Sequence, residues 1–376
     1  MASFNTSPMT KRTSIGSFIW YMITSAWDKM VLWFISKMFA WALVVTLSIP
    51  HRYRMSHNNG IAAKGKVRIV DHPAFPPHDF FQPGRTFPAR VRHASATFLD
   101  DAMNCIRSLS VKFSEHHMES PFDMEMNTGP INLFWSARSF LQFAKLRKQK
   151  WGVEYHDYYR IYPQGLEGAK VSLRRNPTSF HNLRYHSLTP YLFIGKDGIK
   201  RYAKYRAMPF DKEPETGITT DLSDWDTCNQ RVFPNETRSR NYLKDEYKQR
   251  IEKEGAKYMM QIQTRIAADD DSPEIFNNQI PWDEKIFPWQ DLAVIEIEEV
   301  LSWKDTLMTS FSLNNMPKSL GFIPAKSIYD YNSLNYMRSH SEVARKARIF
   351  SYKLFGYPPE IPYDDNRNVS EWSGKE

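Results

Sequence analysis

Val294-Ile-Glu-Ile-Glu-Glu-Val300 and Met260-Gln-Ile-Gln-Thr-Arg-Ile266 both alternate apolar with polar side chains. This is the pattern of a β-strand with one buried face. Tyr191-Leu-Phe-Ile-Gly-Lys-Asp-Gly-Ile-Lys-Arg-Tyr202 predicts a hairpin, because two apolar runs flank a glycine-bounded turn. Val67–Val70 is a further short strand. From residue 51 onward the chain is therefore predicted to be mostly β.

Helical patterns are fewer and lie between the strands. They cover Phe140–Lys150, Arg240–Glu254 and residues 334–353, the last interrupted at Ser339-His-Ser341. Long strands, peripheral helices and 23 prolines predict an α+β fold, with one β-barrel-like domain and long loops.

Composition narrows the class of protein. Among 376 residues, 50 Lys and Arg oppose 42 Asp and Glu, a net charge of +8. Because the basic residues are spread along the chain, we expect no nucleic acid, and anionic lipid or an acidic small substrate suits the charge as well. A mean hydropathy of −0.56 excludes a polytopic membrane protein. Two cysteines are too few for a disulfide scaffold or a cysteine zinc site.

The composition changes near residue 50, so we divide the chain into an apolar segment, 1–50, and a main domain, 51–376. Met30 to Ile49 is twenty residues, long enough to cross a bilayer, and Pro50 would end it. Lys37 would be costly in hydrocarbon, so two shorter amphipathic helices lying in the membrane interface fit better. We therefore expect a membrane-associated, intracellular protein. The alternative is a hydrophobic helix packed on the protein's own core.

Familiar catalytic motifs are absent from the sequence. The eleven histidines include no His-Glu-x-x-His, and the pairs His116/His117 and His181/His186 have no carboxylate at ligand spacing. A glycine-rich phosphate loop and a Gly-x-Ser-x-Gly elbow are missing as well.

Four other segments are informative when taken together. They are Arg54-Met-Ser-His57, Gly84-Arg-Thr-Phe-Pro-Ala-Arg-Val-Arg-His-Ala-Ser95, Asp123-Met-Glu-Met-Asn-Thr-Gly-Pro130 and Lys346-Ala-Arg-Ile-Phe-Ser-Tyr352. In this order and separation they resemble the catalase superfamily, most closely its small branch of catalase-related allene oxide synthases and hydroperoxide lyases. The resemblance extends from about Arg54 to Tyr352.

The resemblance implies a haem b cofactor inside an eight-stranded antiparallel β-barrel. His57 matches the distal histidine and Asn127 the distal asparagine of the family. Tyr352 matches the proximal tyrosine that ligates the haem iron. The matching arginines are Arg348, four residues before that tyrosine, and Arg54 and Arg92, which pair with the haem propionates. His93 is interpreted as structural.

Each of these roles has a physical basis. A tyrosinate is an anionic ligand, which a guanidinium one helical turn away helps to keep ionised. Arginine forks suit propionates. An imidazole can move a proton between peroxide oxygens, and an amide can hold the developing hydroxyl. In the last helix, the assignment of Tyr352 requires an insertion of roughly ten residues relative to the allene oxide synthases known from coral lipoxygenase fusions. Without it, Glu342 would occupy the ligand position.

The residue type at position 56 indicates the class of substrate. Large catalases carry an apolar residue before the distal histidine, whereas the allene oxide synthases carry threonine, and Ser56 keeps that hydroxyl. The resemblance therefore implies cleavage of the O–O bond of a fatty-acid hydroperoxide, giving an allene oxide or, by chain cleavage, an aldehyde. The alternatives are a hydrogen-peroxide-dependent peroxidase, catalase or tailoring enzyme, and a haem-free barrel that binds a lipid or partner. The oligomeric state is left open.

Overall fold

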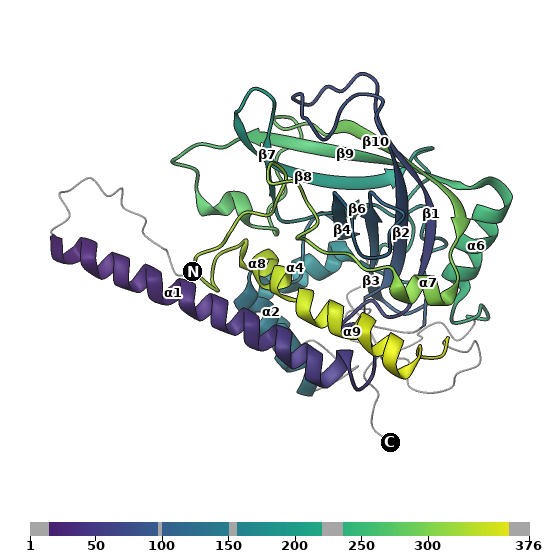
Figure 1. The fold of residues 1–376 in the computed structure, drawn as a ribbon, viewed down its shortest axis with the longest axis horizontal. Helices are drawn as coiled ribbons and strands as arrows, with labels where there is room; N and C mark the ends of the chain where they lie inside the picture. The colour runs from purple at the N-terminus through teal and green to yellow at the C-terminus, as the bar shows by residue number, and fades with distance from the viewer. Residues whose placement is uncertain (1–14, 97–99, 150–155, 220–235, 361–376) are drawn as a thin grey trace.

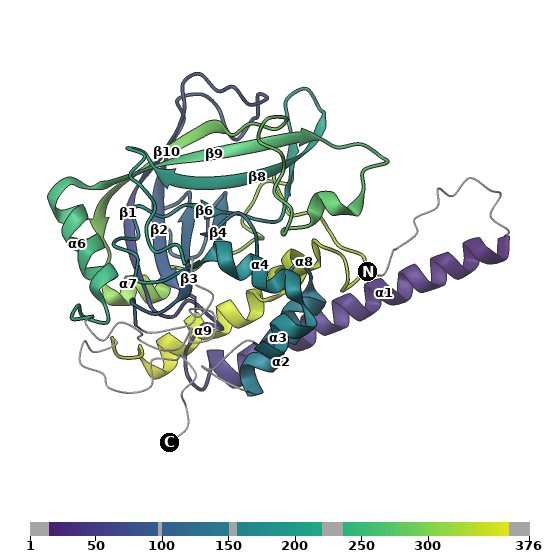
Figure 2. The same ribbon diagram turned by 180° about the vertical axis from the view of Figure 1, so that it is seen from behind.

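Eight antiparallel strands close into a barrel in the computed structural model, which describes residues 15–96, 100–149, 156–219 and 236–360 (Figures 1 and 2). Around the ring the order is β2-β1-β10-β9-β8-β6-β4-β3, and β3 pairs again with β2. The strands are β1 (Gly60–Ile69), β2 (Thr86–Ser95), β3 (Cys105–Lys112), β4 (Asp123–Thr128), β6 (Tyr185–His186), β8 (Lys200–Pro209), β9 (Ala256–Ile266) and β10 (Gln290–Val300). The predicted eight-stranded antiparallel barrel is confirmed.

Two short strands lie beside the ring. β5 (Leu173–Arg174) pairs with β3, and β7 (Tyr191–Ile194) pairs with β8. The β7–β8 pair is the hairpin predicted from the sequence, and β9 and β10 contain the two alternating stretches, now seen to pair with each other.

The inside of the barrel is packed with large side chains. Tyr185, Tyr205 and Tyr258 are fully buried there beside aliphatic residues of every long strand. His93 belongs to this interior, where its Nε2 lies 2.9 Å from the Tyr258 hydroxyl and its ring stacks on Phe180. The structural role expected for His93 is confirmed.

Helices cover the outside of the barrel. They are α1 (Ile15–Leu43), α2 (Ala137–Gln149), α3 (His156–Ile161), α4 (Pro163–Ser172), α6 (Tyr242–Glu254), α7 (Trp303–Met308), α8 (Ser333–His340) and α9 (Glu342–Phe355), with a π-helical turn at Val44–Ser48 and a 3₁₀ turn at Pro273–Phe276. Figure 1 shows α1, α8 and α9 running together beneath the barrel. The break predicted near Ser341 separates α8 from α9.

The apolar N-terminal segment forms one helix. The expectation of two shorter helices is wrong, because α1 continues without interruption past Asp28, Lys29 and Lys37. These side chains are exposed, so they need no break in the backbone. One helical stretch, Met22–Ser48, is long and apolar enough to cross a membrane among the described residues. The division of the chain at residue 50 stays a prediction.

Candidate active site

A cavity of about 370 Å³ lies between the barrel and the helices. Arg92, Ser108 and Asn127 line it from β2, β3 and β4. Their strand neighbours His93 and Leu109 point the other way, into the barrel core, because successive side chains of a strand alternate between its faces. The cavity therefore lies on the outer face of β2-β3-β4. The expectation of a site inside the barrel is wrong, since the interior is filled by its own aromatic side chains.

Ser56, His57 and Asn127 all line this cavity. His57 has a positive φ of 63°, and its backbone N–H donates to the Ala96 carbonyl at 3.0 Å. Few non-glycine residues adopt this conformation, which places the side chain where an ordinary extended residue would not. The Ser56 Oγ lies 2.7 Å from His57 Nδ1. The predicted contact between hydroxyl and imidazole is therefore present.

The three predicted arginines also line the cavity. Arg54 Nη2 donates to the Thr309 carbonyl at 2.8 Å, and Arg92 Nη2 donates to the His57 carbonyl at 2.7 Å. Burial, followed by the nearby guanidinium groups of Arg348 and Arg92, lowers the pKa of Arg54 well below its usual value. Like charges held this close favour binding of an anion.

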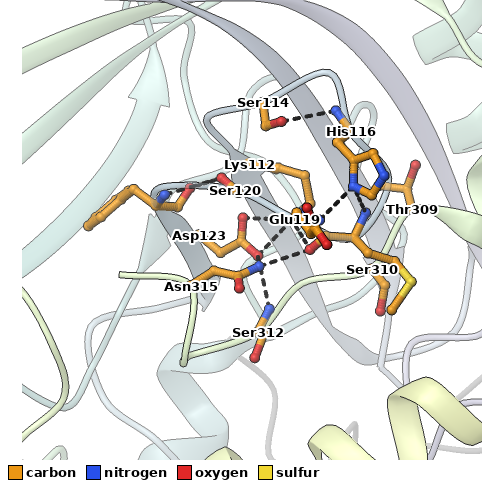
Figure 3. A network of polar contacts seen from close by, with 12 residues as sticks. Lys112, Ser114, His116, Glu119, Ser120, Asp123, Thr309, Ser310, Ser312 and Asn315 are labelled. Carbon is orange, nitrogen blue, oxygen red and sulfur yellow. Dashed lines mark hydrogen bonds and ion pairs between the residues drawn. The ribbon is translucent and has the colours of Figure 1, made fainter. Parts of the chain in front are cut away.

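A network of polar contacts holds the loop from Thr309 to Asn315 in place (Figure 3). Its anchor is the buried ion pair of Lys112 with Asp123, whose Nζ–Oδ2 distance is 2.7 Å. Asp123 also accepts the Ser312 backbone N–H at 3.0 Å and the Asn315 amide at 2.8 Å. A buried carboxylate that accepts several hydrogen bonds from a loop holds that loop in place more firmly than hydrogen bonds to water would.

From this loop, hydroxyl groups reach the helices. Ser310 Oγ accepts from Arg348 Nη2 at 3.2 Å, and Ser312 Oγ donates to Glu342 Oε2 at 3.0 Å. Arg345 forms a two-pronged ion pair with the same carboxylate, with Nε 2.8 Å from Oε2. The loop therefore positions one cationic and one anionic side chain of α9 at the cavity.

Tyr352 is placed differently from the other predicted residues. It is buried, but it packs with Leu307 and Ile349 and stacks on Tyr357, with ring centroids 5.5 Å apart. The cavity-lining residues of α9 include Glu342, Arg345 and Arg348, and Tyr352 is not among them. The structure thus brings six of the seven predicted residues to the cavity, and Tyr352 as an iron ligand stays a prediction.

Sequence reasoning assigned no role to Glu125, Arg338 and Arg345 in the cavity wall, and it considered Glu342 only as the alternative residue at the ligand position. Glu125 of β4 pairs with Arg338 of α8, and Glu342 pairs with Arg345. A signal was present in the spacing of Glu342 and Arg345, since residues three apart are neighbours on a helix. The Glu125–Arg338 pair spans most of the chain, so no local pattern could reveal it.

The cavity fits an anionic group that carries more than one acidic oxygen. Its lining contains five arginines against two glutamates. Arg348 Nε and Arg345 Nη1 are buried and have no hydrogen-bond acceptor among the described residues. Haem propionates are such acceptors, and the adjoining apolar side chains, such as Phe134 and Met337, suit a porphyrin plane. These residues fit haem at its carboxylate edge.

A second cluster of ligand-type side chains lies elsewhere. His181, Asp211 and Glu213 each place one ligand atom within 4.8 Å of the others, so carboxylates do approach a histidine that sequence spacing left alone. The Arg250 guanidinium lies 3.6 Å from Glu213 and neutralises the cluster in part. We assign no metal to it.

The comparisons with known proteins agree with the chemistry that the cavity residues suggest. No family model matches the chain. It is 39% identical over 289 residues to the "Allene oxide synthase-lipoxygenase protein" of Plexaura homomalla, which covers 76% of this chain and 27% of that protein. It is 27% identical over 306 residues to a "Linolenate 9R-lipoxygenase" of Nostoc, covering 78% of this chain and 38% of that protein.

A third relative is an uncharacterized protein of Sinorhizobium fredii, 26% identical over 170 residues, covering 43% of this chain and 71% of that protein. The chain thus spans 27% and 38% of the two longer relatives. It is homologous to one part of each of these two proteins, and the likeness to the first fits the allene oxide synthase-like branch.

Proposed function

We propose that this protein is a haem-dependent enzyme that cleaves the O–O bond of a fatty-acid hydroperoxide, as an allene oxide synthase or a hydroperoxide lyase does. The observation that carries the proposal is the convergence of Ser56, His57 and Asn127 on one cavity with the buried Arg92 and Arg348 and the partly buried Arg54. Homology to part of an allene oxide synthase-lipoxygenase protein supports the same chemistry.

When bound, haem would supply the one-electron chemistry that breaks the peroxide bond. Arg54, Arg92 and Arg348 would hold its propionates. The His57 imidazole and the Asn127 amide would then orient the hydroperoxide through hydrogen bonds. Apolar residues of the cavity wall would accept the acyl chain and keep water from the reacting oxygens.

A purified full-length chain, reconstituted with hemin, tests this proposal. We expect a Soret band and loss of the conjugated-diene absorbance of a linoleate or linolenate hydroperoxide. His57→Gln should keep the Soret band and lower turnover about a hundredfold, the size of a lost proton-transfer or orienting group. A colourless chain would contradict the proposal. Rapid oxygen release from hydrogen peroxide with the lipid hydroperoxide untouched would favour a catalase instead.

We also propose that α1 binds a membrane surface beside the cavity. One stripe of the helix, which includes Leu32 and Ala40, is buried against the protein, so lipid cannot surround it there. Phe39 and Leu43 of the same helix line the cavity. Such a helix suits binding in the membrane plane better than crossing the bilayer.

The exposed surface of α1 supports this membrane contact. Trp27, Trp33 and Trp41 are 61%, 49% and 55% exposed. Exposed Lys29 and Lys37 lie between these tryptophans in the sequence. Tryptophan prefers the headgroup region, and lysine attracts anionic lipid. An acyl substrate could therefore pass from the bilayer to the cavity along α1.

Vesicle flotation tests the membrane proposal. The full chain should float with phosphatidylcholine–phosphatidylserine vesicles, and changing Trp27, Trp33 and Trp41 together to Gln should abolish flotation. A matched control changes three exposed isoleucines outside α1 to Gln, Ile218, Ile266 and Ile286, and should float like the parent. A parent chain that stays in solution, or a tryptophan variant that floats equally well, would overturn the membrane proposal.

A further inference from the structure

A smaller pocket adjoins the main cavity. Its volume is about 30 Å³, and it is lined by residues of β6, β8 and β9 and of the segment 281–289. His186 and Leu188 line both this pocket and the main cavity, so the two spaces share one wall. We call the smaller space the side pocket. Its lining includes one lysine, Lys204, which the proposed haem site does not use.

Strand pairing places the side pocket next to the site. Asn127 of β4 pairs directly with His186 of β6, and His186 pairs with Arg206 of β8. Lys204 lies two residues before Arg206 on β8, and its two sequence neighbours belong to the barrel core. Its side chain therefore points to the outer face of the barrel, because side chains alternate along a strand. Lys204 is thus a diagonal neighbour of His186.

Lys204 brings a buried positive charge to the side pocket. It is 6% exposed, and its Nζ lies 3.3 Å from the Ile280 carbonyl and 4.9 Å from the centre of the Trp282 ring. No carboxylate among the described residues forms an ion pair with it, and Glu284 of the same pocket lies 3.6 Å from Arg206 instead. An ammonium has three donors, and a buried charge is costly without a partner. Burial accordingly lowers the pKa of Lys204 to about 7.

The arginines of the main cavity already have anionic partners. Arg338 and Arg345 are paired with the two glutamates of the lining, and the other three arginines are assigned to the haem propionates. A fatty-acid hydroperoxide carries one more negative charge, on its terminal carboxylate, and burying that charge requires a cation. Lys204 is a buried cation beside the cavity that has no carboxylate partner among the described residues.

The wall between the two spaces consists of side chains that a ligand could displace. Leu188 has a positive φ of 68°, a strained conformation for a bulky residue, and such strain is often found at ligand sites. The buried Nδ1 of His186 has no hydrogen-bond partner among the described residues. Rotation of these two side chains would join the side pocket to the main cavity.

We propose that the side pocket binds the terminal carboxylate of the fatty-acid hydroperoxide, with Lys204 as its counterion. The acyl chain then passes His186 and Leu188 into the main cavity, and its apolar end lies against side chains such as Phe39 and Phe140. A volume of about 30 Å³ has room for about two waters, which suits the two oxygens of a carboxylate. This inference rests on the proposed function and places one end of its substrate.

Esterification of the substrate tests the carboxylate on the hemin-loaded full chain. In the parent, kcat/KM for linoleate hydroperoxide should exceed that for its methyl ester by about tenfold or more, mostly through KM, as expected of a buried charge-assisted hydrogen bond. Lys204→Met keeps much of the side-chain volume and removes the charge, so kcat/KM for the acid should fall to about that for the ester, with the Soret band retained. Lys200→Met, an exposed change on the same strand, is the matched control and should keep the parent's preference.

A second variant supplies a protein carboxylate to the lysine. Gln263 of β9 pairs directly with Lys204 of β8, and both residues line the side pocket. Gln263→Glu should therefore form an ion pair with Lys204, compete with the substrate carboxylate and lower the preference for the acid. This variant decides the question if Lys204→Met does not fold, because it neutralises the buried lysine without removing it.

The outcomes separate this inference from the proposed function. Equal kcat/KM for acid and ester in the parent, or a full acid preference in both variants, would overturn the role of Lys204 and leave the enzyme intact. A parent chain that consumes neither substrate would overturn the proposed function. Calorimetric titration with linoleate and methyl linoleate then still tests the side pocket. Tighter binding of linoleate that Lys204→Met abolishes would support the site, and equal binding of both lipids by the parent would overturn it.

Discussion

His57 adopts a left-handed backbone conformation beside a serine hydroxyl, and the two features act on one ring. The backbone fixes where the imidazole lies. The hydroxyl, 2.7 Å from Nδ1, influences which nitrogen carries the proton. When the hydroxyl donates to Nδ1, the neutral ring carries its proton on Nε2. A ring in that form donates a hydrogen bond to a peroxide and is a poor base for it.

Replacement of Ser56 tests this effect. Ser56→Val removes the hydroxyl that bonds Nδ1, which favours the ring form with an unprotonated Nε2 that can act as a base. We expect oxygen release from hydrogen peroxide to rise about tenfold or more, measured with an oxygen electrode on the hemin-loaded chain. Ser56→Thr keeps the hydroxyl and should stay near the parent rate. Equal rates in Val and Thr variants would show that the hydroxyl has no such role.

Gly60, the first residue of β1, leaves room for the side chain of Arg92, which lines the cavity. A Cβ at Gly60 would lie 2.8 Å from the Arg92 guanidinium carbon and would overlap the His93 carbonyl. We expect Gly60→Ala to lower the melting temperature and to weaken hemin binding, because Arg92 must move. Gly321→Ala, whose Cβ would meet nothing closer than 3.9 Å, is the control and should be near neutral. Unaltered hemin affinity in Gly60→Ala would argue against Arg92 as a propionate ligand.

The β3–β4 pair carries the ion pair that anchors the cavity loop. Burial lowers the pKa of Lys112 and raises that of Asp123, so each needs the other to stay charged. Asp123→Asn leaves the lysine buried without its counterion and should cost about 3–5 kcal/mol of unfolding free energy. Denaturant titration measures this cost.

An exposed ion pair provides the comparison for Asp123. Arg68 and Asp71 are about half exposed, so Asp71→Asn should change stability by about 1 kcal/mol or less. Similar costs for Asp71→Asn and Asp123→Asn would mean that the buried pair does not anchor the loop as described.

Elements with a strong periodic pattern could be predicted, and those without one could not. The alternation in β9 and β10 and the turn between β7 and β8 fixed these strands in advance. β6 is two residues long, so its place in the ring depends on partners in β4 and β8. The N-terminal helix was misjudged because exposed charges were taken as interruptions of a membrane segment.

At the scale of the whole molecule, the site could be predicted where its residues lie on regular strands or follow a motif. Arg92 and Asn127 reach the cavity by simple alternation along β2 and β4. Which face of the barrel holds the cavity could not be predicted, because it depends on whether aromatic side chains fill the interior. The position of Tyr352 relative to Glu342 depends on how α9 is docked, and a motif does not encode that docking.

Buried histidines should make the whole fold sensitive to acid. Burial lowers the pKa of His93 to about 3 in the native state, whereas its pKa in the unfolded chain is about 6.5. Between these two pH values, His93 is neutral in the native state and protonated in the unfolded state. The unfolded state therefore binds more protons between these values, and stability falls as the pH drops through that window. Urea unfolding at pH 7 and pH 5 should show that His93→Gln loses about 2 kcal/mol less than the parent over this interval. An identical loss in the two proteins would mean that the barrel interior opens enough to let His93 take up a proton while folded.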